Sequence, residues 1–260
     1  MDIVTIAGLI LGLGALMASV VLEGGQISSL FSLPAFVTVF GGTAGATAIG
    51  FTLAELKTVP QLLGIAFKDK KYDATNLIVT LVGFAEKARR EGLLALEENL
   101  SEIDDPFLKK GMQLVIDGTD AELVRSIMET ELTFIQERHH KGAAIFEAAG
   151  GFGPTMGIIG TVMGLVNVLG NLSEAETLGP SIATAFIATL YGVGSANVFF
   201  LPVAAKLKNR SSQQILLHEV TLEGILSVQA GDNPRIVEEK LLAFLAPKAR
   251  GAVKEQNSGD

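Results

Sequence analysis

Two threonines, Thr161 and Thr189, are the residues of this 260-residue chain whose surroundings best suit them for chemistry. Each lies in an uncharged segment among small residues that recur every three or four positions, a spacing that a helix gathers on one face. The two stripes are Gly157, Thr161, Gly164 and Asn171, and Ala185, Thr189, Gly192 and Ala196. A threonine hydroxyl can donate to a carboxylate or coordinate a cation, although threonines in a helix also bond to their own backbone carbonyls. Because one hairpin carries both stripes, we interpret them as the lining of an ion path.

The segments that carry these stripes, residues 148–172 and 177–205, contain no Asp, Glu, Lys, Arg or His. An ion path through hydrocarbon needs an ionisable group within the membrane, to relay the ion or to neutralise it. The titrating carboxylate must therefore come from another chain packed against the stripes. The sequence thus predicts an obligate membrane partner.

Two prolines, Pro154 and Pro202, lie near the same end of the two segments. A proline within a helix has no N–H to donate, so it frees the carbonyl four residues earlier, here at Gly150 and Val198, and permits a bend. Membrane helices tolerate such kinks without any function. If these two are functional, they are coupling hinges that link ion occupancy to motion outside the membrane.

A charged segment, EKARREGLLALEENL, offers a candidate docking surface. Read as one helix, it places Arg90 and Glu97 seven residues apart on the same face, with Arg89 and Glu98 alongside. Such a face is either simply solvated or a surface for a partner of opposite charge.

The sequence gives little support for an enzyme. His139, His140 and His218 have no HExxH spacing, GGFGP does not continue as a nucleotide-binding loop, and a phosphate-binding GxxxxGK[ST] motif is missing. The chain has no cysteine, so disulfides and thiolate metal sites are excluded. We therefore predict no catalytic residues, no metal site and no cofactor.

The composition predicts an all-α membrane protein. Hydrophobic residues make up 48% of the chain and charged residues only 18%. Four uncharged runs are long enough to cross a hydrocarbon core of roughly 30 Å as helices. They are residues 3–22, a run within 24–54, residues 148–172 and residues 177–205.

The distribution of positive charge predicts the topology. All 20 Lys and Arg lie within Lys57–Lys141 or Lys206–Lys254, and the two short connections, Glu23–Pro34 and Ser173–Glu176, have none. By the positive-inside rule both termini are cytoplasmic. A cleaved signal peptide is disfavoured because no positive region precedes the first run. The net charge of −8 argues against nucleic acid as a partner.

Outside the membrane the chain is expected to form amphipathic helices. Residues 1–54 hold the first two spans and residues 148–205 hold the other two. Between them, residues 55–147 form a cytoplasmic helical domain with turns near 69–73, 104–106 and 117–119. Residues 206–260 form C-terminal helices and a tail. Thr119 and Glu122 suggest a capping box that starts a long helix running into the third span. Asn233 and Pro234 suit the start of a short helix. The third and fourth spans are both expected to extend into the cytoplasm as rigid helices.

Four stretches together are similar to one known family. The segments ARREGLLALE, GPTMGIIGTVMGLVNVLG, ATLYGVGSANVFFLPVAAKL and VTLEGILSVQ resemble the A subunit of the bacterial flagellar motor stator, the MotA/PomA family. The resemblance covers nearly the whole chain. The ExbB/TolQ proteins are more distant relatives, with a different number of spans and no RREG-type segment.

The resemblance implies a multi-pass protein of the bacterial inner membrane that acts in motility and chemotaxis. It implies a ring of five A subunits around a pair of single-span B subunits that supply the intramembrane aspartate. Flow of H+ or Na+ through the complex would then drive rotation and produce torque on a switch-complex protein of the rotor. By correspondence, Pro154 and Pro202 are the coupling prolines, Arg89 (or Arg90) and Glu97 engage the rotor, and Thr189 faces the ion path.

The coupling ion stays open. Sodium-driven members resemble this chain at Thr161 and Thr189, whereas some of them have threonine where Ala188 stands. Several members place an aspartate at the position of Gly151. The alternatives to a stator are an ExbB/TolQ-type energy-transducing subunit and a solute transporter, and the latter is disfavoured because no polar substrate cluster or broken repeat pair is evident.

Overall fold

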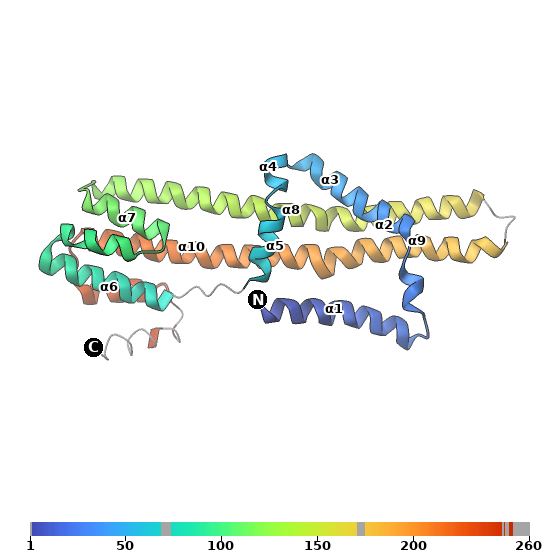
Figure 1. Ribbon diagram of the computed structural model, residues 1–260, viewed down its shortest axis with the longest axis horizontal. Helices are drawn as coiled ribbons and strands as arrows, with labels where there is room; N and C mark the ends of the chain where they lie inside the picture. Colours follow the sequence, from blue (N-terminus) through green and yellow to red (C-terminus); the bar gives the residue numbers. More distant parts are fainter. Residues whose placement is uncertain (1, 69–73, 171–174, 246, 248–249, 252–260) are drawn as a thin grey trace. The chain divides into compact units, whose positions relative to one another are not determined.

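The expected all-α fold is confirmed. The computed structural model describes residues 2–68, 74–170, 175–245, 247 and 250–251, which form helices and turns with no β-strand among them (Figure 1). In chain order the elements are α1 (Ile3–Leu22), η1 (Ile27–Leu30), α2 (Leu33–Phe36), η2 (Val37–Gly41), α3 (Gly42–Gly50), α4 (Leu53–Leu56), α5 (Val59–Phe67), α6 (Ala74–Glu91), η3 (Leu93–Glu102), α7 (Pro106–Ile116), α8 (Ala121–Gly170), α9 (Ala175–Ser195), η4 (Ala196–Phe200), α10 (Leu201–Gln229) and α11 (Pro234–Leu242). The predicted turn at 69–73, Asn171 and the tail from residue 252 lie outside the described residues.

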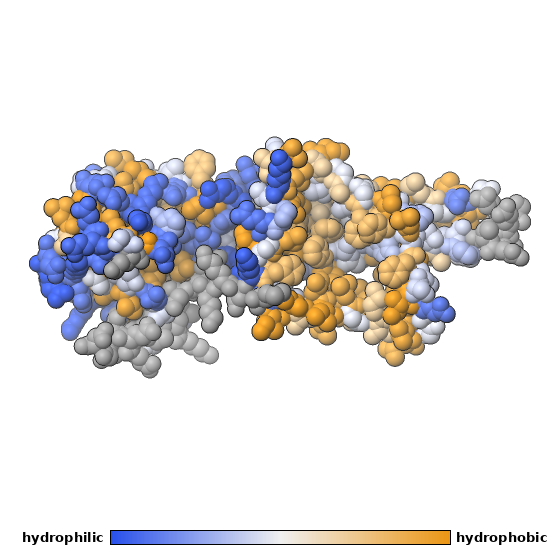
Figure 2. Space-filling view, viewed as in Figure 1, coloured by the Kyte–Doolittle hydropathy of each residue, from blue (hydrophilic) through white to orange (hydrophobic). Residues whose placement is uncertain are grey.

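The chain divides into two compact units. The membrane unit comprises Met1–Asp69 and His139–Asn209, and the polar unit comprises Lys70–Arg138 and Arg210–Asp260. Apolar side chains cover the surface around α1 and α3, whereas hydrophilic ones gather over α6 and α7 (Figure 2). The helices α8 and α10 each contribute residues to both units.

Within the described residues, four helical segments are long and apolar enough to cross a membrane, as predicted. They are Ile3–Leu22, Leu33–Gly50, Ala121–Gly170 and Leu178–Gln229. The second combines α2, η2 and α3, and the fourth combines α9, η4 and α10. Two of these elements, η2 and η4, are π-helical turns, which are common at functional sites in α-helices.

The first two spans begin at polar caps. The Asp2 carboxylate accepts hydrogen bonds from the backbone N–H groups of Val4 at 3.1 Å and Thr5 at 3.3 Å. The Ser32 hydroxyl accepts from Ala35 N–H at 3.4 Å, and Pro34 stands in the first turn, as expected. Such caps satisfy N–H groups that have no partner within the helix.

The long helix into the third span is confirmed, but its predicted cap is wrong. The helix α8 runs from Ala121 to Gly170, and Asp120 caps it by accepting a 2.9 Å hydrogen bond from Glu122 N–H. A carboxylate suits the positive end of the helix dipole, which explains why Asp120 takes this place. Thr119 belongs instead to the preceding turn, where its N–H donates to Leu114 O at 3.1 Å.

The polar unit has its own hydrophobic core, built from α6, η3, α7, α11 and the parts of α8 and α10 that belong to it. Its largest fully buried side chains are Ile78, Leu81, Leu96, Met112, Met128, Ile225 and Leu241. Asn233 caps α11 and is followed by Pro234, which confirms the predicted helix start there. Asp105 caps α7 in the same way, and Pro106 stands in its first turn.

Candidate functional site

The two small-residue stripes face each other across the contact between α8 and α9. A Cβ added at Gly157 would lie 2.9 Å from Ala188 O and 3.2 Å from Thr189 Cα. A Cβ added at Gly164 would lie 2.7 Å from the Ala185 side chain. The two backbones therefore approach as closely as small residues allow, and the stripes first of all pack the hairpin.

The contact brings both predicted threonines together. Thr161 Oγ1 lies 3.0 Å from Gly157 O and 3.0 Å from Ala185 O, and it is also hydrogen bonded to Thr189 Oγ1. The Thr161 hydroxyl has one hydrogen, so it donates to one acceptor at a time while its oxygen can accept from Thr189. Both threonines are half-buried.

This arrangement gathers four oxygens, two hydroxyl and two carbonyl, inside an apolar unit. Hydroxyl and carbonyl oxygens are groups that can replace the water around a cation, and a hydroxyl can also donate to a carboxylate. The Thr161 hydroxyl does bond to backbone carbonyls, which is one of the two roles expected for these threonines. Because both threonines are only half-buried, the other role, contact with a cation or with a carboxylate of another chain, is open to them as well. The residues of this cluster are Gly157, Thr161, Ala185 and Thr189.

Tyr191 is a further residue of this region, to which the sequence assigned no role. Its hydroxyl donates to Leu30 O at 2.6 Å and accepts from Ser32 N–H at 3.2 Å. The tyrosine thus ties α9 to the connection that precedes α2. A tyrosine within an apolar span is itself a signal, because its buried hydroxyl needs a partner.

The two predicted hinge prolines have different surroundings. Pro154 lies within α8, one residue after Gly153, and the helix continues through it. Pro202 is the second residue of α10 and follows the π-helical turn η4 directly. At Pro202 the helix therefore accommodates the lost N–H next to a wider turn. The coupling roles of both prolines stay predictions.

The four predicted docking residues do not share one helix face, contrary to the reading of EKARREGLLALEENL as one helix. Gly92 has φ +89° and ends α6 after Glu91, and the 3₁₀ helix η3 begins at Leu93. A left-handed φ is easily adopted by glycine alone, which explains the break. Arg89 and Arg90 occupy the last turn of α6, where a positive charge suits the helix dipole.

A lysine brings η3 back beside α6. Lys87 Nζ donates to Asn99 Oδ1 at 2.8 Å and lies 4.0 Å from a carboxylate oxygen of Glu98. Of the candidate residues, Glu98 is therefore held beside α6. Arg89, Arg90, Glu97 and Glu98 are all exposed.

The histidines do not form a metal site within the described residues, where no three side chains of His, Cys, Asp or Glu come together. His139 and His140 lie in α8, and His218 is buried beside the Phe107 ring, at a centroid distance of 4.3 Å.

Three carboxyl groups outside the spans have a lowered pKa. The Lys206 ammonium, hydrogen bonded to Asp2, holds the pKa of that carboxyl well below its usual range. The backbone and side chain of Thr52 lower the pKa of Glu55. A 2.7 Å hydrogen bond from Lys240 lowers the pKa of Asp232. These groups stabilise helix ends and have no part in the hydroxyl cluster.

Comparison with known proteins agrees with this architecture. Residues 6–92 match the family model described as motility protein A N-terminal, and residues 99–220 match the MotA/TolQ/ExbB proton channel family. Motility protein A of Bacillus subtilis (strain 168) is 41% identical over 98% of this chain and 95% of its own length.

The chain belongs to the motility protein A family.

Three further similarities support membership of the motility protein A family. Chemotaxis protein PomA of Vibrio alginolyticus is 36% identical over 94% of this chain and 96% of its own length. A structure of the flagellar MotAB stator complex from Bacillus subtilis contains a chain with 41% identity and a TM-score of 0.89, covering 94% of this chain and 97% of that one. A chain in the structure of C. jejuni MotAB has a TM-score of 0.90 at 32% identity, covering 95% and 97%. The match to the motility-specific N-terminal model makes an ExbB/TolQ-type subunit the less favoured alternative.

Proposed function

We propose that this chain is the A subunit of a flagellar stator, in which cation flow beside a B subunit produces torque on the rotor. The observation that carries the proposal is the half-buried oxygen cluster around Thr161 and Thr189, in segments (148–172 and 177–205) that hold no Asp, Glu, Lys, Arg or His. Relatives of nearly full length that are named motility protein A support it.

The B subunit supplies the missing charge. Its single span carries an aspartate whose carboxylate accepts a hydrogen bond from the Thr161 or Thr189 hydroxyl when ionised and takes up H+ or Na+ when the ion passes. The two hydroxyls and the carbonyls of Gly157 and Ala185 provide oxygens for the ion at this level. No resident cofactor takes part.

An exposed apolar face of α8 gives the partner chains a place to pack. Ile158, Val162 and Val166 recur every four residues, and 57%, 55% and 63% of these side chains is exposed. The residues adjoin Thr161 in sequence, so a helix on this face lies close to the hydroxyl cluster. We assign the face to the B subunit and to neighbouring copies of the A subunit in a ring of five.

The rotor contact lies at the end of α6. Arg89, Arg90 and Glu97 are exposed, whereas Glu98 is near Lys87 of the same chain. We therefore assign the main contact with the rotor's switch-complex protein to Arg89, Arg90 and Glu97, with Glu98 in a smaller role. Pro154 and Pro202 transmit the motion of the spans towards this surface.

The proposal places the protein in the bacterial inner membrane with both termini in the cytoplasm. The clustering of all lysines and arginines outside the two short connections supports this topology.

The test is swimming in a strain that lacks its own A subunit. This chain, expressed with its B subunit, should restore swimming, and Thr161→Ala should change how swimming speed depends on external sodium at fixed pH. A chain that restores no swimming, although it accumulates in the membrane with its B subunit, would refute the proposal. If the swimming speed is independent of sodium both with the original chain and with Thr161→Ala, the coupling ion is the proton.

A further inference from the structure

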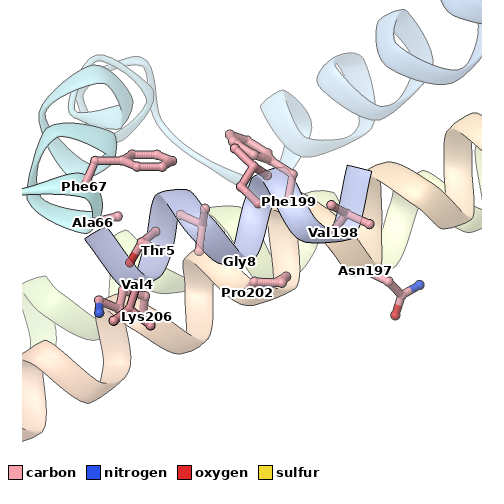
Figure 3. A pocket seen from close by; sticks show the side chains of 13 residues that line it. Val4, Thr5, Gly8, Ala66, Phe67, Asn197, Val198, Phe199, Pro202 and Lys206 are labelled. Carbon is pink, nitrogen blue, oxygen red and sulfur yellow. The ribbon is translucent and has the colours of Figure 1, made fainter. Parts of the chain in front are cut away.

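A groove of about 420 Å³ lies beside α1, outside the ion path. Its walls come from α1, the end of α5, η4 and the start of α10, and they are mainly apolar or small: Val4, Gly8, Ala66, Phe67, Val198 and Pro202 (Figure 3). Thr5, Asn197 and Lys206 are the polar residues of its lining. The groove lies entirely within the membrane unit.

Two contacts between α1 and its neighbours flank the groove. At one end, a Cβ added at Gly12 would lie 3.2 Å from the Val198 side chain. At the other end, Asp2 forms an ion pair with Lys206, and its N–H donates to Phe67 O at 2.9 Å. Between these contacts, a Cβ added at Gly8 would meet none of the described residues of another element within 4 Å. The space is therefore a gap between two points of close packing.

The groove extends over most of one leaflet. From Val4 to Gly12, the part of α1 that lines it, the helix rises about 12 Å at roughly 1.5 Å per residue, whereas half of a hydrocarbon core of about 30 Å is about 15 Å. A volume of about 420 Å³ over this length corresponds to a mean cross-section of roughly 35 Å². A helix with a diameter of about 10 Å needs more than twice that area, so it does not fit, whereas a single extended hydrocarbon chain does.

The surroundings supply such a chain. The helix α1 has no buried residue and a mean hydropathy of 2.3, so its surface is suited to hydrocarbon. The polar end of the groove carries Lys206, whose ammonium keeps N–H donors beyond the one that Asp2 accepts, and the exposed Lys68 follows Phe67. Basic pockets between spans at the cytoplasmic surface suit the phosphate of a lipid headgroup.

We propose that this groove binds one acyl chain of a phospholipid from the cytoplasmic leaflet, with the lipid phosphate at the Lys206 ammonium. The inference rests on the membrane topology proposed above and not on the motor function. A chain that proves inactive in motility can therefore still bind the lipid.

The test uses the full chain with its B subunit in vesicles of phosphatidylethanolamine and phosphatidylglycerol that contain a phospholipid with a photoactivatable diazirine in one acyl chain. After illumination, mass spectrometry of peptides should find the label concentrated on Val4–Gly12 and Val198–Lys206. Gly8→Leu should lower this labelling at least about tenfold, because its side chain takes the place of methylene groups of the lipid. Gly14→Leu is the matched control on the same helix, since Gly14 has equally open space but does not line the groove.

A second variant keeps the test decisive if Gly8→Leu fails to enter the membrane. Lys206→Gln should lower the labelling about tenfold, which corresponds to the loss of a charge-assisted hydrogen bond. The proposal is overturned if the label spreads evenly along α1, if Lys206→Gln and Gly8→Leu label like the original chain, or if a photoactivatable free fatty acid labels the groove as well as the phospholipid does. A cross-link showing that a side chain of a second copy fills the groove would overturn it as well.

Discussion

A single methyl group at Gly192 should open the contact that holds the hydroxyl cluster together. In Gly192→Ala the new Cβ would collide with Gly153 O and lie 3.0 Å from Gly157 Cα, whereas ordinary contact begins at 3.4 Å. The helices α8 and α9 must therefore separate by about 0.4 Å or more. The same displacement takes the distance between Thr161 Oγ1 and Ala185 O from 3.0 Å to about 3.4 Å, beyond the usual range of an O–H···O bond.

The expected loss is mainly functional. Replacing glycine with alanine in a helix gains about 1 kcal/mol, and overpacking costs about 1–3 kcal/mol, so the free energy of unfolding should fall by about 0–2 kcal/mol. Swimming should be lost or nearly lost although the amount of protein in the membrane is unchanged. The reason is that the hydroxyl oxygens of Thr161 and Thr189 and the carbonyl oxygens of Gly157 and Ala185 no longer lie close enough together to act on one ion.

Gly194→Ala is the matched control, because it lies in the same helix and a Cβ there has nothing within 4 Å. It should keep full swimming and the gain of about 1 kcal/mol in helix stability. Swimming speed and thermal unfolding of the purified complex with the B subunit measure both effects. Normal swimming of Gly192→Ala, or equal damage by both alanines, would refute the role of close α8–α9 packing.

Three other perturbations test separate parts of the structure. Pro154→Ala restores an N–H to the ladder of α8 and should spare membrane assembly but abolish swimming; normal swimming would remove the hinge role. Arg89→Glu should weaken swimming, and the complementary reversal in the rotor protein should partly restore it; no change in either background would mean that the residue is only solvated. Asp232→Asn should lower the free energy of unfolding at pH 7 by at most about 1 kcal/mol, since the Lys240 pair is exposed. Because the pKa of Asp232 is lowered on folding, this stabilisation is present above the ordinary pKa near 4 and is lost as the pH falls through the lowered pKa, so the difference between the variant and the original chain should shrink as the pH falls below about 4, with Asp104→Asn as a neutral control.

The apolar runs and caps could be read directly from the sequence, because span length and N-terminal capping are local properties. The spans, the unbroken α8 and the cap at Asn233 follow from such rules. The cap of α8 was misplaced by one residue, since Thr119 and Asp120 both suit the position and only the preceding turn decides between them.

The site was only partly predictable. Three- and four-residue spacing placed Thr161 and Thr189 on stripes, but spacing within one helix does not show that the stripes of two helices face each other. Charge spacing alone does not reveal the break at Gly92, although a glycine after Arg89, Arg90 and Glu91 is a typical helix stop. The partners of the Tyr191 hydroxyl lie about 160 residues away in sequence, so no local pattern identifies them.

The central claim is that this chain provides only half of an ion path, and ion flux into vesicles tests it most directly. The chain is reconstituted alone, with its B subunit, and with a B subunit whose membrane aspartate is replaced by asparagine, and the uptake of H+ or Na+ is followed under an imposed membrane potential, worth about 2.3 kcal/mol per charge per 100 mV. We expect flux only with the intact B subunit, and a reduced flux when Thr161→Ala is combined with it. Flux through this chain alone, or undiminished flux with the asparagine variant, would contradict the account.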